Sequence, residues 1–168
     1  MTRYLVTIFC LFVALTSYGQ AVAVKQQAEQ MGNALLKKDY KTFVTFSYPA
    51  ILKQMGGADQ MAANIQQQMS TMEGQGAKVV GLTYGTPSPF VKAGTELQCT
   101  IPQQMVVQMA QGKIASKSTL IAISPDQGKR WYFVDAGERD LATIRKSLSN
   151  ISKSLVIPKP EPPKMLSR

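Results

Sequence analysis

Apolar residues in the first half of the chain recur at helical spacing. They predict a helix over residues 24–38, a short helix after Asp39 and a longer helix after Asp59. Aspartate suits the start of a helix because its carboxylate accepts a hydrogen bond from a first-turn backbone N–H. The apolar stripe of the longer helix consists of Met61, Ile65, Met69 and Met72.

The period of the pattern changes to two in the second half, which predicts about four antiparallel strands. Leu97, Cys99 and Ile101 alternate with polar residues and should share one face of a strand. A short helix is expected after Asp140. Because helices and strands are segregated along the chain, the expected fold class is α+β, with N-terminal helices packed on a curved antiparallel sheet and a short C-terminal helix.

Two of the predicted strands, at residues 120–123 and 131–134, are apolar on both faces. Helices can cover only one face of an antiparallel sheet. The other face therefore needs cover from sheet curvature, from the C-terminal tail, or from a second copy of the chain. The third option predicts a homodimer through the outer face of the sheet.

The two ends of the chain differ from the rest in composition. Residues 1–19 have a charged start, a short apolar core and small residues at Ser17 and Gly19, which is typical of a cleavable signal peptide; an uncleaved anchor is the alternative. Residues 20–155 are expected to form one α+β domain. Residues 156–168 are rich in proline and should form a disordered basic tail. The protein is therefore expected to be exported, either periplasmic or secreted, with no transmembrane span in the mature chain.

Charge and absent residue types narrow the chemistry. The formal net charge is +9, with basic residues concentrated near the C-terminus. This indicates either an anionic partner or a solubilising surface. A nucleic-acid partner is not expected, because no basic and aromatic stripe is present. The chain has no histidine, so we expect neither a metal site nor a cofactor.

Cys99 is the lone cysteine after the predicted signal peptide. It cannot form an intrachain disulfide in the mature protein. Its position between Leu97 and Ile101 favours burial, with a reactive thiol as the alternative.

Asp135 is the one acid with a weak case for catalysis. It follows a strand and is in phase with Trp131 and Phe133, so it becomes a candidate base if that face lines a cavity. The alternative is an exposed turn acid near Arg139.

Abundant methionine suggests a soft apolar pocket, or alternatively an ordinary core without a ligand. Tyrosine on the helices could donate hydrogen bonds to a ligand in such a pocket. The candidate lining residues are Tyr40, Tyr48, Met61, Ile65, Met69, Leu97, Cys99, Ile101, Trp131 and Phe133.

Several local strings together resemble a group of uncharacterised exported bacterial proteins. The order of elements is also similar to the cystatin-like cone of the nuclear transport factor and ketosteroid isomerase superfamily. The resemblance implies an exported protein with that fold, and it transfers no catalytic residue. The strings are Tyr48-Pro49, Met55-Gly56-Gly57, Leu97-Gln98-Cys99-Thr100-Ile101-Pro102, Ser124-Pro125-Asp126-Gln127-Gly128-Lys129 and Trp131-Tyr132-Phe133-Val134-Asp135.

Three functions follow as hypotheses. The first is a non-enzymatic binding or accessory module of the cell envelope with a small apolar pocket. The second is an isomerase- or cyclase-like enzyme that uses Asp135 with a tyrosine. The third is a structural or interaction module that acts through the basic C-terminal region.

Overall fold

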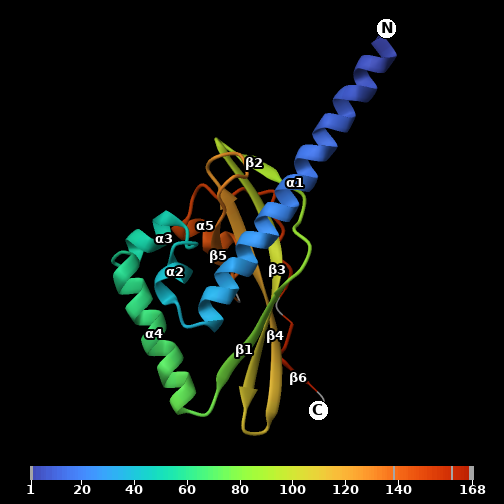
Figure 1. The fold of residues 1–168 in the computed structure, drawn as a ribbon. Coiled ribbons are helices and arrows are strands. Elements are labelled where there is room, and N and C mark those ends of the chain that lie inside the picture. Colours follow the sequence, from blue (N-terminus) through green and yellow to red (C-terminus); the bar gives the residue numbers. More distant parts are fainter. Residues whose placement is uncertain (1, 138, 160, 167–168) are drawn as a thin grey trace.

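The computed structural model describes residues 2–137, 139–159 and 161–166, with side chains from Gly19 onward. Five helices and six strands confirm the α+β class (Figure 1). The helices are α1 Thr2–Leu36, α2 Tyr40–Val44, α3 Pro49–Gln54, α4 Ala58–Gly74 and α5 Leu141–Ser147. The strands are β1 Lys78–Tyr84, β2 Val91–Ala93, β3 Glu96–Met109, β4 Gly112–Ser124, β5 Tyr132–Asp135 and β6 Lys164–Leu166.

The helix starts follow from local capping, with one exception. The carboxylates of Asp39 and Asp140 accept hydrogen bonds from Thr42 N at 3.0 Å and Thr143 N at 2.7 Å, which confirms both predicted caps. The predicted cap at Asp59 is wrong. Helix α4 starts one residue earlier, so Asp59 lies in its first turn, where its negative charge suits the N-terminal end of the helix dipole.

Helix α1 is longer than the sequence pattern predicted. It runs without interruption from the predicted signal segment through the predicted first helix. Its close approach to β1 depends on Gly32, because a Cβ atom there would lie 2.6 Å from the Tyr84 hydroxyl oxygen. Within the described part of the chain, no helix has both the length and the apolar character that crossing a membrane requires.

The sheet is antiparallel, in the order β1-β3-β4-β5, with β2 paired to β3 and β6 paired to β4. The four main strands match the expected number, and the two short strands are additional. Strands β3 and β4 pair in an unbroken register from Leu97 opposite Ser124 to Met109 opposite Gly112. This long hairpin is the frame on which the other elements pack.

The two faces of the sheet bury separate apolar clusters. On the inner face, Cys99, Ile101, Leu120 and Phe133 pack with α1. On the outer face, residues of β4 and β5 pack against α5 and the segment that follows it. That outer cluster comprises Ile121, Ile123, Val134, Ala136, Ile144, Leu148, Ile151 and Leu155. The cover that the second apolar face required therefore comes from the chain itself at this end of the sheet.

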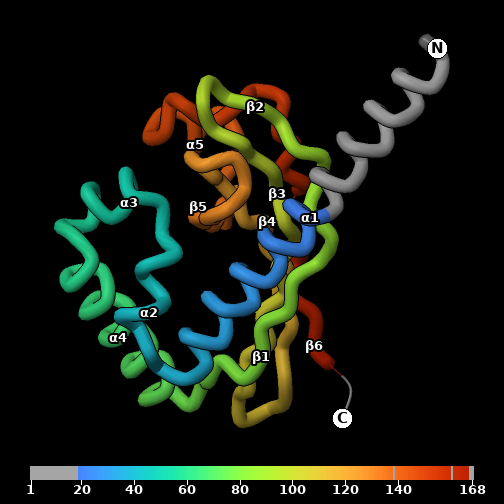
Figure 2. The backbone as a smooth tube through the Cα atoms, turned by 45° about the horizontal axis from the view of Figure 1, so that its top comes forward, coloured from blue at the N-terminus to red at the C-terminus, as the bar shows by residue number. Residues whose placement is uncertain are grey.

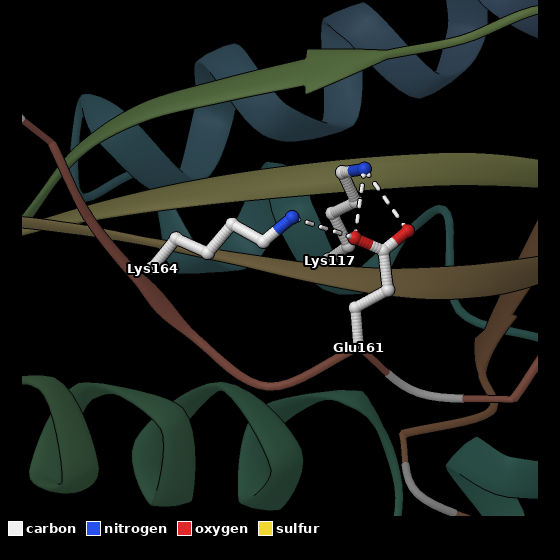
Figure 3. Close-up of polar contacts among 3 residues, drawn as sticks. All are labelled: Lys117, Glu161 and Lys164. Carbon is white, nitrogen blue, oxygen red and sulfur yellow. Dashed lines mark hydrogen bonds and ion pairs between the residues drawn. The ribbon is translucent and has the colours of Figure 1, made fainter.

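The C-terminal chain differs from the expected tail. It passes from α5 at one end of the sheet to β6 at the other (Figure 2). Strand β6 pairs with β4 at residues 113–115. Both carboxylate oxygens of Glu161 accept hydrogen bonds from Lys117, at 3.0 and 3.1 Å, and Lys164 lies 3.4 Å away (Figure 3). These ion pairs are exposed to solvent, so each contributes little to stability.

Candidate functional site

A cavity of about 520 Å³ lies between helices α1–α4 and the inner face of the sheet. Its size falls within the usual range of small-molecule sites. The helices and the short segments between them supply Met31, Leu35, Phe43, Ser47, Ile51, Gln54, Met55 and Met61. The strands and the turn after β5 supply Leu82, Gln103, Met105, Ser116, Ser118, Leu120, Phe133, Val134, Asp135 and Arg139.

The cavity exists because the inner face of β4 changes character along the strand. Leu120 and Ala122 point toward α1 and are buried in the inner core. Two and four residues before Leu120, the same face carries Ser118 and Ser116. Serine is too small to fill the space below the helices, and its hydroxyl group suits contact with water or a ligand.

Polar groups gather on the strand side of the cavity. The Gln103 amide nitrogen donates to the Ser118 hydroxyl oxygen at 3.2 Å across the β3–β4 pair. Arg139 lies in the turn after β5, where its Nε donates to Ala136 O at 3.2 Å and its Nη2 donates to Asp135 O at 2.6 Å. The helix side is mostly apolar, with Ser47 and Gln54 as its polar residues, so the cavity is amphipathic.

Asp135 lies in the cavity lining, at the end of β5. Its side chain is exposed, and one carboxylate oxygen accepts a hydrogen bond from Gly137 N at 2.8 Å. The Tyr84 hydroxyl is buried and has no hydrogen-bond partner among the described residues. Burial raises the pKa of Tyr84, and the negative charges of Asp135 and Glu29 raise it further.

Only two of the ten predicted pocket residues, Met61 and Phe133, line this cavity. Cys99, Ile101 and Trp131 are fully buried in the inner core. Burial raises the pKa of the Cys99 thiol to about 12, so the thiol stays protonated.

The surroundings of Trp131 show why it is enclosed. Its indole nitrogen donates to Gly128 O at 3.0 Å, and its ring centroid lies 5.7 Å from that of Phe90. The remaining candidates on strand and helix are also outside the cavity lining. Leu97 packs against the inner core, while Ile65 and Met69 lie half-buried on α4.

The two candidate tyrosines lie apart from the cavity. Tyr40 lines a separate depression formed with Lys38, Asp39 and Asp59. The Tyr48 hydroxyl donates to Glu96 Oε1 at 2.7 Å and accepts from Asn150 Nδ2 at 2.7 Å. Two causes raise the pKa of Tyr48 to about 12: burial has the larger effect, and the hydrogen bond to Glu96 adds to it. This polar network ties α3 and β3 to the C-terminal segment.

Most of the cavity lining was not predicted from the sequence. Leu35 and Phe43 belong to predicted helices, but their facing direction depends on tertiary packing. One sequence signal could have located part of the lining: polar residues occupy inward positions of strands that are apolar further along. These residues are Gln103, Ser116 and Ser118. Arg139 carried none, because the path of the turn after β5 is not encoded in a periodic pattern.

A second cavity of about 410 Å³ lies on the outer side of the sheet, next to the C-terminal chain. Its lining is mostly polar and includes Thr83, Gln104, Lys117, Lys159 and Glu161. Within residues 2–137, 139–159 and 161–166, no group of three or more His, Cys, Asp or Glu side chains is placed to hold a metal ion.

Comparison with protein-family models, curated proteins and solved structures finds no match. The site is therefore interpreted from its own geometry.

Proposed function

We propose that this protein is an exported binding or accessory module of the cell envelope, and that its inner cavity takes a small ligand with an apolar body. The observation that carries the proposal is the cavity of about 520 Å³, whose lining is mainly apolar and whose polar groups lie mostly on the strand side. Such pockets hold ligands mainly by apolar area, at about 25 cal/mol per Å² removed from water, less the costs of association.

The proposal includes the fold family. Helices packed on one face of a long antiparallel hairpin, with a cavity left between them, are what a cystatin-like cone provides. The local strings at residues 97–102 and 124–135 support a relation to the exported bacterial proteins that they resemble.

The proposed export, which rests on the composition of residues 1–19, is compatible with the way α1 docks after the predicted cleavage site. Gln20, the first residue after that site, donates from its side chain to Gln127 O at 3.2 Å. Gln27, further along α1, donates to Lys129 O and accepts from Trp131 N. Cleavage after Gly19 leaves all of these contacts on the mature chain. The intact mass of protein recovered from an exporting host tests this, and a mass that includes Met1 contradicts it.

The ligand proposal is tested on the mature full-length protein by native mass spectrometry and by thermal melting. We expect a co-purified or added apolar compound of small mass to bind with one-to-one stoichiometry and to raise the melting temperature.

Two substitutions in the same helix provide a matched comparison. Met61 lines the cavity, whereas Met72 is half-buried in α4 outside the lining. Met61→Trp should fill the space and abolish binding, and Met72→Trp should leave binding unchanged. Binding that survives Met61→Trp, or its absence for every apolar compound tested, would overturn the proposal.

A further inference from the structure

Several polar groups on the cavity floor can donate hydrogen bonds to a ligand. The Ser118 hydroxyl oxygen already accepts from Gln103, so its own hydrogen can be donated into the cavity. Ser116 presents a second hydroxyl on the same face of β4. Arg139 adds a guanidinium group, which has five N–H donors and no acceptor. A ligand group placed there is best served by accepting hydrogen bonds.

Backbone contacts hold Arg139 at this edge of the cavity. Its two side-chain hydrogen bonds go to carbonyl oxygens, those of Ala136 and Asp135, and these leave the positive charge in place. The neighbouring Asp135 carboxylate accepts from Gly137 N. The ion pairs found among the described residues are Lys38–Glu73, Lys117–Glu161 and Lys164–Glu161, and none of them involves Arg139.

We propose that the ligand is an apolar carboxylic acid, whose hydrocarbon part packs against the methionine-rich helices and whose carboxylate is bound by Arg139 and Ser118. This inference rests on the proposed function of the cavity and adds the chemical class of the ligand. Arginine is suited to this role because the guanidinium has five N–H donors and the two backbone carbonyls occupy only two of them, which leaves charged donors for a carboxylate.

Asp135 places a negative charge beside the proposed carboxylate site. It lines the same end of the cavity, so its negative charge opposes that of a bound carboxylate. Arg139 and Asp135 should therefore have opposite effects on acid binding. Removing the arginine charge should weaken the binding of an acid, whereas removing the aspartate charge should strengthen it.

The test compares acids with alcohols of the same carbon skeleton on the mature full-length protein. Decanoate and decanol, and cinnamate and cinnamyl alcohol, are titrated by calorimetry. We expect at least one acid to bind about ten-fold or more tightly than its alcohol, the range of a charge-assisted hydrogen bond.

The variants are Arg139→Gln, Asp135→Asn and the control Arg145→Gln, which lies on α5 outside the cavity lining. Arg139→Gln should remove the preference for the acid while keeping alcohol binding. Asp135→Asn should increase acid affinity, and Arg145→Gln should change neither.

The possible results separate this inference from the proposed function. If no acid and no alcohol binds, both fail. If alcohols bind as tightly as acids and Arg139→Gln changes neither affinity, the carboxylate assignment is wrong and the apolar pocket stands. If Asp135→Asn weakens acid binding, Asp135 contacts the ligand as a partner and the assignment is also wrong.

Discussion

Strand β4 passes through two different environments along its length. Residues 120–124 are buried, with α1 covering one face and α5 and the following segment covering the other. Residues 112–118 are exposed or half-buried, with the inner cavity on one side and the C-terminal chain on the other. One strand thus serves as the core at one end and as the floor of a candidate site at the other.

The difference shows how a small domain can combine a well-buried core with a cavity. The buried half supplies apolar burial on both faces, which is the dominant favourable contribution to folding. The open half can then carry Ser116 and Ser118, which contribute little to the core. A domain whose inner face was serine-rich throughout would lack the apolar area needed to fold.

The largest expected effect on the free energy of unfolding comes from the buried half of β4, residues 120–124. Ile121 is fully buried in the outer cluster. Ile121→Ala should lower the free energy of unfolding by about 2–5 kcal/mol, because it removes apolar contacts and leaves a cavity. Ser118→Ala, in the open half, should change it by less than about 1 kcal/mol. Urea denaturation of both variants measures the contrast, and equal losses would show that the two halves do not differ as described.

The second-largest effect on stability is expected where hydrogen bonds join β3 to the segment after α5. Gln98 is fully buried, donates to Asn150 O at 3.1 Å and accepts from Ser152 N at 2.9 Å. Gln98→Ala should cost about 1–3 kcal/mol, because it leaves these backbone groups without their partner. Hydrogen exchange should rise at residues 150–155 more than in the hairpin near Met109. A uniform rise in hydrogen exchange across the protein would indicate a loss of global stability and would contradict this local role of Gln98.

A third prediction uses Cys99 as a reporter of the inner core. Burial raises its pKa from the ordinary value of 9.0 to about 12 in the folded protein. A thiol whose pKa is raised by folding stabilises the native state fully below pH 9.0, and this contribution is lost as the pH rises toward 12.

The native protein should therefore react slowly with a thiol reagent at pH 8 until denaturant is added. Cys99→Ala should also reduce the loss of stability at alkaline pH. Fast labelling of the folded protein would contradict the burial of this residue.

The smallest expected effect is at the C-terminal chain. The pKa of Glu161 is lowered by its hydrogen bonds to Lys117 and Lys164. Its contribution to docking is therefore present above the usual glutamate range and is lost as the pH falls through the lowered value. Glu161→Gln should raise hydrogen exchange in β6 with little change in global unfolding. High salt should have the same effect on the unsubstituted protein, because it screens exposed ion pairs. Unchanged exchange in both cases would show that β6 is held by other contacts.

The sequence predicted the fold class well because periodicity is a local property. Alternation placed Cys99 in the core, and apolar runs located the strands that are buried on both faces. Capping chemistry placed the starts of α2 and α5 at Asp39 and Asp140. The paths of residues 148–159 and 161–166 were not predictable, because they depend on packing against the outer face of the sheet and on pairing with the distant strand β4.

The site was predicted less well for the same reason. Apolar residues at inward positions were assigned to the pocket, but the deepest of them, such as Ile101 and Trp131, pack against one another. The cavity forms where packing stops, next to Ser116 and Ser118. A pattern search finds residues that fill a core more readily than it finds the places where filling ends.

Methionine methyl groups offer the most direct test of the cavity. Met31, Met55, Met61 and Met105 line it, whereas Met69, Met72, Met109 and Met165 do not. In a protein labelled with ¹³C at the methionine methyl groups, each signal can be assigned by substitution to leucine. We expect titration with decanoate to shift the signals of the first four residues and to leave the other four unchanged. Absence of shifts at the first four, or shifts centred on Met165 in β6, would contradict the assignment of this cavity as the binding site.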